Sequence, residues 1–138
     1  MLLLGGLAAS PGRGAEEPEE ITALGEQMEQ MSSAFRRLRR QAAEPAYNES
    51  SLELVAIMQQ TAEAALALAP AKAAELPEAA RAEFIAAYRT RIGELRTGLE
   101  KLAERLRAAD NPAAVKLVAE LAALQKTGHR EFRKRERD

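Results

Sequence analysis

Met28 and His129 are the two side chains whose types and positions could bind a metal ion from opposite sides. His129 is the chain's single histidine and lies late in the last of four predicted helices, whereas Met28 lies early in the first. If the four helices run up-down-up-down, the start of the first and the end of the last lie at the same end of the bundle. An imidazole and a thioether that face each other across a core can hold haem iron from both sides, and this ligand pair favours electron transfer.

Four amphipathic segments would position these two residues. Apolar side chains recur at steps of three and four over residues 17–42, 51–69, 78–109 and 112–133, which is the pattern of helices that bury one face. The connections between the segments are short, so neighbouring helices should run antiparallel. The sequence therefore predicts an all-α fold, an antiparallel up-down-up-down four-helix bundle.

Turn and capping residues set the expected helix boundaries. Ser50 and Glu53 form a capping-box pattern for the second helix, and Pro70 is expected to end it. Asn111 is the expected N-cap of the fourth helix, because Pro112 follows it in a position that suits the first helical residue.

Composition narrows the class of protein. The 138 residues suffice for one domain, and with 46% hydrophobic but only 4% aromatic residues the core must be aliphatic and rich in alanine. Twenty basic residues nearly balance 21 acidic ones, which argues against a nucleic-acid-binding protein, since such a protein needs a large basic surface. The absence of cysteine excludes disulfides, thiolate metal sites, iron–sulfur clusters and covalent haem attachment through a C-x-x-C-H motif.

The N-terminal sequence bears on the compartment. Residues 1–9 (MLLLGGLAA) form a short apolar run, and small residues at Gly12 and Gly14 would permit cleavage near Ala15. This pattern is typical of a secretory signal peptide that lacks its basic first part. The run is far shorter than the roughly 20 apolar residues that a transmembrane helix needs. We therefore expect a signal peptide over residues 1–15 and a periplasmic domain over 16–138; a disordered apolar leader is the alternative.

Aromatic and small side chains gather at the end of the predicted bundle that holds Met28 and His129. Phe84, Tyr88 and Phe132 all fall there, and the facing half of the second helix, residues 62–69, is mostly alanine. Small side chains opposite this cluster would leave a volume that native packing does not tolerate empty. A flat apolar cofactor would fill that volume.

Each candidate residue also has a simpler structural interpretation. A methionine on a helix seam is usually core filler, and Met31 and Met58 occupy seam positions as Met28 does. Met31 lies one turn from Met28 and could replace it as a ligand. A lone histidine on the flank of a helix, such as His129, is usually solvated or caps the helix end. The alanine run could equally serve close helix packing.

The chain resembles the cytochrome b562 family over about residues 17–135, on the segments EQMEQM (26–31), FIAAYRTRIGELRTGL (84–99) and LAALQKTGHREFR (121–133). The resemblance implies a four-helix bundle that binds one non-covalent haem b, with Met28 and His129 as the axial iron ligands. It also implies that Phe84 and Tyr88 pack near the porphyrin. The chain departs from the family pattern at Gly128, where an aromatic residue commonly precedes the histidine.

The resemblance implies a small soluble b-type cytochrome that transfers single electrons in the periplasm to a redox partner that the sequence does not identify. We expect a monomer with no nucleic-acid partner, no stable membrane insertion and no enzymatic activity. Ser/His/Asp and Cys/His sets are missing, and a Glu-x-x-His diiron motif is excluded because Lys126 stands three residues before His129. The alternatives are a haem-free periplasmic adaptor or chaperone-like bundle and, with fewer soft ligands in its favour, a metal-sensing bundle.

Overall fold

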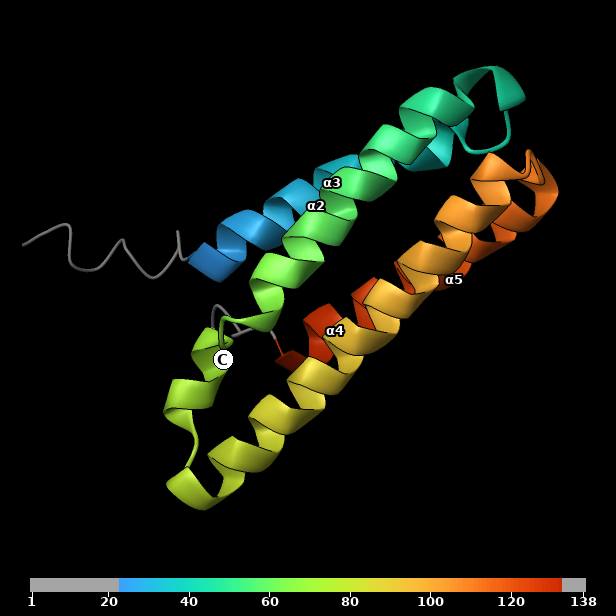
Figure 1. Cartoon of the computed structure of the whole chain (residues 1–138). Helices are drawn as coiled ribbons and strands as arrows, with labels where there is room; N and C mark the ends of the chain where they lie inside the picture. Colours follow the sequence, from blue (N-terminus) through green and yellow to red (C-terminus); the bar gives the residue numbers. More distant parts are fainter. Residues whose placement is uncertain (1–22, 133–138) are drawn as a thin grey trace, which may run out of the picture.

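Four long α-helices form an antiparallel bundle in the computed structural model, which describes residues 23–132 (Figure 1). Each helix packs against the next along the chain, and α2 also contacts α5, so the four helices close into a ring. The predicted all-α, up-down-up-down architecture is therefore confirmed, and the described residues contain no strand. The elements in chain order are α2 (Ala23–Gln41), the 3₁₀ helix η3 (Pro45–Tyr47), α3 (Asn48–Leu66), the 3₁₀ helix η4 (Ala71–Glu75), α4 (Glu78–Arg107) and α5 (Asn111–Phe132).

Two predictions fall outside the described residues. The leader with its cleavage point near Ala15 and the first turn of the helix predicted from residue 17 both precede Ala23. Residues 133–138, the charged end of the chain, follow the last described residue.

The core is aliphatic, as the composition predicts. Its largest side chains without solvent exposure lie along the middle of the bundle and toward the end formed by the α2–α3 and α4–α5 turns, and burying each one contributes about 1.5–3 kcal/mol relative to an exposed position. They come from all helices but α5, which contributes Val118 and Leu121 at slightly higher exposure. The fully buried large side chains are Met31, Leu38, Val55, Met58, Leu99, Leu102 and Leu106.

The predicted start of α3 is wrong by three residues. Pro45 opens η3, which continues directly into α3 at Asn48, so the helix is already formed before Ser50. No side chain caps its N-terminus, and the capping box that Ser50 and Glu53 suggested is therefore absent. The hydroxyl groups of Ser50 and Ser51 instead accept hydrogen bonds from Nε2 of Gln41, at 3.0 and 3.1 Å, which ties the end of α2 to the start of α3.

The α4–α5 turn also differs from its prediction. The backbone N–H groups of Ala109 and Asp110 donate to the carbonyls of Leu106 and Arg105, the Schellman arrangement, with Ala109 in the left-handed region at φ 56°. Asp110 caps α5, because its Oδ1 accepts from the N–H of Ala113 at 3.3 Å. The predicted N-cap, Asn111, is the first helical residue instead.

The Asn111 side chain instead joins three helices at this end of the bundle. It is buried, and its Nδ2 donates to the carbonyl of Ala42 at 2.7 Å and to Oδ1 of Asn48 at 2.8 Å. Asn48 Nδ2 donates in return to Asn111 Oδ1 at 3.3 Å. This reciprocal amide pair satisfies polar groups that burial would otherwise penalise.

At the opposite end, the α3–α4 connection is more structured than the predicted linker. α3 ends at Leu66, three residues earlier than predicted, and the following alanine–lysine segment forms η4. The Arg81 guanidinium, from the first turn of α4, donates to the carbonyls of Ala73 and Leu76 at 3.1 and 2.9 Å. These bonds fasten η4 to the beginning of α4.

One stretch of the described residues, Pro45–Glu75, is long and apolar enough to cross a membrane by length and composition, with a mean hydropathy of 1.2 over its most apolar window. In the fold this stretch is divided into η3, α3 and η4, and α3 packs between α2 and α4. The same composition suits the core helix of a bundle.

Candidate cofactor site

Met28 and His129 lie at the same level of the bundle, on adjacent antiparallel helices. Gln125 Nε2 on α5 donates to Ser32 Oγ on α2 at 3.4 Å, which fixes the register of the two helices. Met28 lies four residues before Ser32, and His129 lies four residues after Gln125. Because the two helices are antiparallel, these two steps lead in the same direction, so Met28 and His129 each lie about 6 Å beyond the Gln125–Ser32 contact, toward the end where α2 begins and α5 ends.

Both side chains also face the seam between α2 and α5. His129 follows Gln125 by four residues and therefore lies on the same face of α5, the face that meets Ser32. Met28 packs partly buried against the core, on a face of α2 between the core-facing Met31 and the seam-facing Ser32. Both residues are half-buried, so neither is enclosed in the core nor fully in solvent.

Met31 occupies a different environment from Met28. It has no solvent exposure, and its sulfur lies 3.7 Å from the hydroxyl of Thr61, which donates to the carbonyl of Met58 at 2.9 Å. Met31 thus packs into the middle of the bundle against α3. Of the two methionines that the sequence leaves open as ligands, Met28 is the one level with His129.

The predicted aromatic cluster is present and joins three helices. Phe132 packs edge-on against Phe84 and Tyr88, with ring centroids 5.2 and 5.6 Å apart. The Tyr88 hydroxyl donates to the carbonyl of Ala65 on α3 at 2.6 Å, and burial raises the pKa of Tyr88 to about 12. Tyr88 therefore stays protonated at ordinary pH and forms an apolar wall with its one polar atom satisfied.

Space remains beside the histidine. Gly128 lies four residues before Phe132 and seven after Leu121, two buried residues, so it falls on the core-facing stripe of α5. A Cβ atom added there would nevertheless meet nothing within 4 Å. Facing α5 across the bundle, Ala62 and Ala65 of α3 are fully buried but small. Several larger apolar residues around this end are only partly buried, namely Leu24, Met28, Leu66, Phe84 and Leu124.

The donor atoms available limit which metal group could bind. Within residues 23–132, no group of three or more histidine, cysteine, aspartate or glutamate side chains could hold a metal ion. Met28 and His129 supply two soft or borderline donors, which is too few for a bare ion. A metal ion that already carries four nitrogen ligands in a flat ring would need only these two, and a Cβ atom at Gly128 would meet nothing within 4 Å.

The family model for cytochrome b562 matches residues 23–133, which include every described residue. The chain belongs to the cytochrome b562 family. Members of this family are helical bundles and electron-transfer haem proteins. No individual curated protein and no solved structure matches the chain.

Membership of the cytochrome b562 family confirms the resemblance that the sequence motifs indicated. The assignment of Met28 and His129 to the iron, and of Phe84 and Tyr88 to the porphyrin wall, stays a prediction. The structure brings Phe84 and Tyr88 together with Phe132 at the end of the bundle that carries both candidate ligands.

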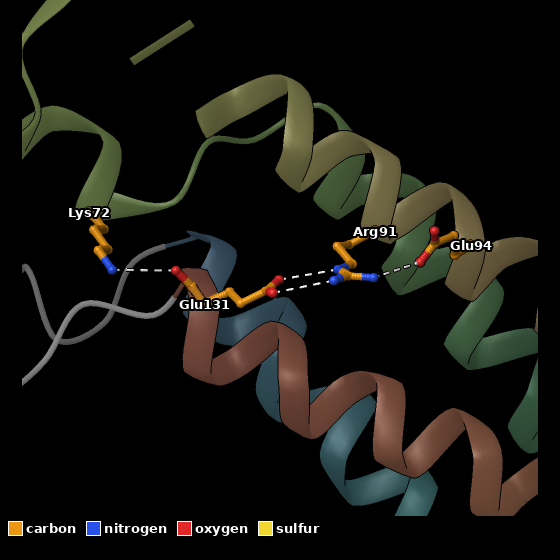
Figure 2. A network of polar contacts seen from close by, with 4 residues as sticks. All are labelled: Lys72, Arg91, Glu94 and Glu131. Atoms are coloured by element: carbon orange, nitrogen blue, oxygen red, sulfur yellow. Dashed lines mark hydrogen bonds and ion pairs between the residues drawn. The ribbon is translucent and has the colours of Figure 1, made fainter. Parts of the chain in front are cut away.

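A polar network at the rim of the site was not anticipated from the sequence. Arg91 of α4 binds both carboxylate oxygens of Glu131 on α5, at 3.1 and 3.2 Å, and also Glu94 at 3.2 Å (Figure 2). Lys72 Nζ of η4 donates to the Glu131 carbonyl at 3.4 Å. The hydrogen bonds from Arg91 hold the pKa of the Glu131 carboxyl below its ordinary value.

The network borders a surface hollow of about 420 Å³ between α4 and α5. Its lining residues are Phe84, Ala87, Thr90, Arg91, Glu131 and Phe132. The close approach of Gly98 to Leu121 sets the register of α4 against α5 and brings Arg91 near the last turn of α5.

Proposed function

We propose that this member of the cytochrome b562 family binds one non-covalent haem b, with Met28 and His129 as axial ligands, and transfers single electrons. The observation that carries the proposal is the register of α2 and α5, since the Gln125–Ser32 contact brings the thioether and the imidazole to one level on facing helix surfaces. The open space beside Gly128 and the fully buried alanines of α3 support a flat apolar group between them.

The chain's own residues determine what such a haem would do. A bound haem supplies a one-electron change between ferric and ferrous iron. The His129 imidazole and the Met28 thioether would hold the iron between them and leave no coordination site for oxygen or a substrate. As a ligand, the thioether would raise the reduction potential, because methionine ligation favours ferrous iron. The protonated Tyr88 and the two phenylalanines near it keep the surroundings apolar without a buried charge.

The proposal includes export to the periplasm and action as a monomer. The apolar run at residues 1–9 and the small residues before Ala15 support export. Near-balanced charge supports a protein redox partner rather than a nucleic acid. Mass spectrometry of the protein from a periplasmic extract of its host should find a mature chain that starts near Ala15, whereas an intact Met1 in the cytoplasmic fraction would contradict export.

Titration of the purified chain with haem, followed by absorbance, tests the ligand assignment. The expected complex contains one haem per chain and has a six-coordinate, low-spin spectrum. His129→Ala should abolish tight binding, because no second histidine exists. Met28→Ala should keep some haem but shift the spectrum toward high spin and lower the potential, since one axial position opens.

Met31→Ala is the matched control, since it removes a methionine one turn away. It should leave the spin state unchanged, because Met31 packs against Thr61 in the core. If Met31→Ala opens the site and Met28→Ala does not, the ligand is one turn deeper than proposed. A chain that takes up no haem would favour the alternative of a haem-free helical adaptor.

A further inference from the structure

The last turn of α5 carries His129 and is fastened to two other elements by residues that follow the histidine. Phe132 packs between Phe84 and Tyr88 of α4. Glu131 is bound by Arg91 of α4 through its carboxylate and by Lys72 of η4 through its carbonyl (Figure 2). Lys72 also lies over the Phe84 ring, with Nζ 5.8 Å from the centroid.

Glu131 stands where the helix itself disfavours a negative charge. The C-terminal end of a helix carries a partial negative charge, so a carboxylate in the last turn of α5 is repelled by the helix dipole. The final carbonyls of a helix also lack partners within it, and helix ends fray for that reason. Arg91 offsets the first effect with its positive charge, and Lys72 partly offsets the second because it donates a hydrogen bond to the Glu131 carbonyl.

The Arg91–Glu131 pair also has the geometry that makes an ion pair directional. Two nitrogens of the guanidinium, Nε and Nη2, donate to the two carboxylate oxygens at 3.1 and 3.2 Å, a side-by-side arrangement that fixes orientation as well as distance. The third nitrogen, Nη1, donates to Glu94 one turn along α4 at 3.2 Å. Glu94 thereby holds the guanidinium in the orientation that meets Glu131.

We propose that Glu131, held by Arg91, is a positioning residue that fixes the last turn of α5 and so keeps the His129 imidazole directed at the cofactor. The proposal rests on the proposed function, because it concerns the same haem site. Glu131 and Arg91 do not touch the iron; they limit the motion of the helical turn that carries its ligand. Their loss should leave the ligand set intact but make the imidazole leave more often.

Two substitutions test the Arg91–Glu131 pair, one by removing a charge and the other by changing the hydrogen-bond geometry. Glu131→Gln removes the carboxylate, and Arg91→Lys keeps the positive charge but cannot form two parallel hydrogen bonds. Both should speed haem dissociation roughly two- to fivefold, the range expected for a partly exposed ion pair. High salt should speed dissociation in the original chain and have less effect in the Glu131→Gln variant, because no ion pair is left to screen.

Glu63→Gln is the matched control. Glu63 forms an ion pair with Arg96 at 2.7 Å, also on the surface, but that pair joins α3 to α4 and does not involve α5. This variant changes the net charge as Glu131→Gln does and should leave haem dissociation unchanged. The reversed pair Arg91→Glu with Glu131→Arg should recover part of the original dissociation rate.

Hydrogen exchange of the haem-free chain keeps this test independent of the proposed function. Amides over residues 126–132 should exchange faster in Glu131→Gln and Arg91→Lys than in the original chain or Glu63→Gln. Equal exchange in all four proteins would overturn the proposal, and so would haem dissociation in both variants equal to that of Glu63→Gln. If the original chain binds no haem at all, the proposed function fails, and the exchange data alone decide whether the Arg91–Glu131 pair holds this turn.

Discussion

Three helical glycines differ in what surrounds them, and replacing each by alanine tests the interpretation of the cofactor site. A Cβ atom at Gly128 or at Gly93 would meet nothing within 4 Å, whereas one at Gly98 would overlap the Leu121 side chain. Gly128 lies on the core-facing stripe of α5, beside His129. Gly93 follows the core-facing Ile92 by one residue and thus points about 100° away from it.

The expected stabilities follow from helix propensity and packing. Glycine inside a helix costs roughly 0.5–1 kcal/mol relative to alanine, so Gly128→Ala and Gly93→Ala should each stabilise the haem-free chain by about that amount. For a chain of this size, 1 kcal/mol corresponds to about 3 °C in melting temperature. Gly98→Ala should destabilise the chain, because Leu121 is buried and overpacking costs about 1–3 kcal/mol, more than the gain in propensity.

Haem binding should separate the two stabilising substitutions. If the porphyrin occupies the space beside Gly128, a larger side chain there competes with it, and Gly128→Leu should weaken haem binding about tenfold or more, in line with the cost of overpacking. Gly93→Leu should leave the affinity unchanged. Urea unfolding of the haem-free proteins and haem titration of all variants measure both effects. Equal haem affinity in Gly128→Leu and Gly93→Leu would refute the view that the space beside Gly128 holds the cofactor.

Two further predictions concern the turn between α4 and α5 and the buried tyrosine. Ala109→Gly should raise the free energy of unfolding by about 1 kcal/mol, because φ 56° suits glycine better than alanine; chemical denaturation checks this, and an unchanged midpoint would contradict it. The pKa of Tyr88 is about 12 in the folded chain against 10 for an ordinary tyrosine, so the unfolded chain loses its proton first as the pH rises. Stability contributed by Tyr88 is complete below pH 10 and should fall between pH 10 and 12 by at most about 2.7 kcal/mol, at 1.36 kcal/mol per pKa unit. Denaturation at several pH values should show this loss in the original chain and a smaller one in Tyr88→Phe.

The helices of the bundle could be predicted from the sequence because apolar periodicity extends over many residues. The three-and-four spacing from Ile92 to Leu106 admits one buried face, and the structure buries that face. Helix starts depend on a few residues with competing local preferences. Ser50 is a residue type that often caps a helix, but Pro45 begins a helical turn earlier in the chain. The Asn111 side chain binds partners at the end of α2 and the start of α3, and its neighbours in the sequence do not reveal these partners.

The candidate site, too, could be predicted from the sequence only in part. Topology alone was sufficient to predict that Met28 and His129 share one end of the bundle, because alternating helices bring the first and last together. Periodicity cannot give the register between two helices, since that depends on the turns that join them. The pairing of Arg91 with Glu131 depends on this register, so it became visible only with the structure.

The two ends of the bundle differ in how their helices are held together. At the α2–α3 and α4–α5 turns, Asn111 and Asn48 join three helices, and the large aliphatic side chains nearby are fully buried. At the other end, Met28 and Phe84 are only partly buried and the core stripe of α5 contains Gly128. The helices there are held together at the rim instead, by the edge-on rings and by the Arg91–Glu131 pair. Contacts at the rim can keep the helix ends in place while the space between them stays available, which is what a site for a non-covalent cofactor requires.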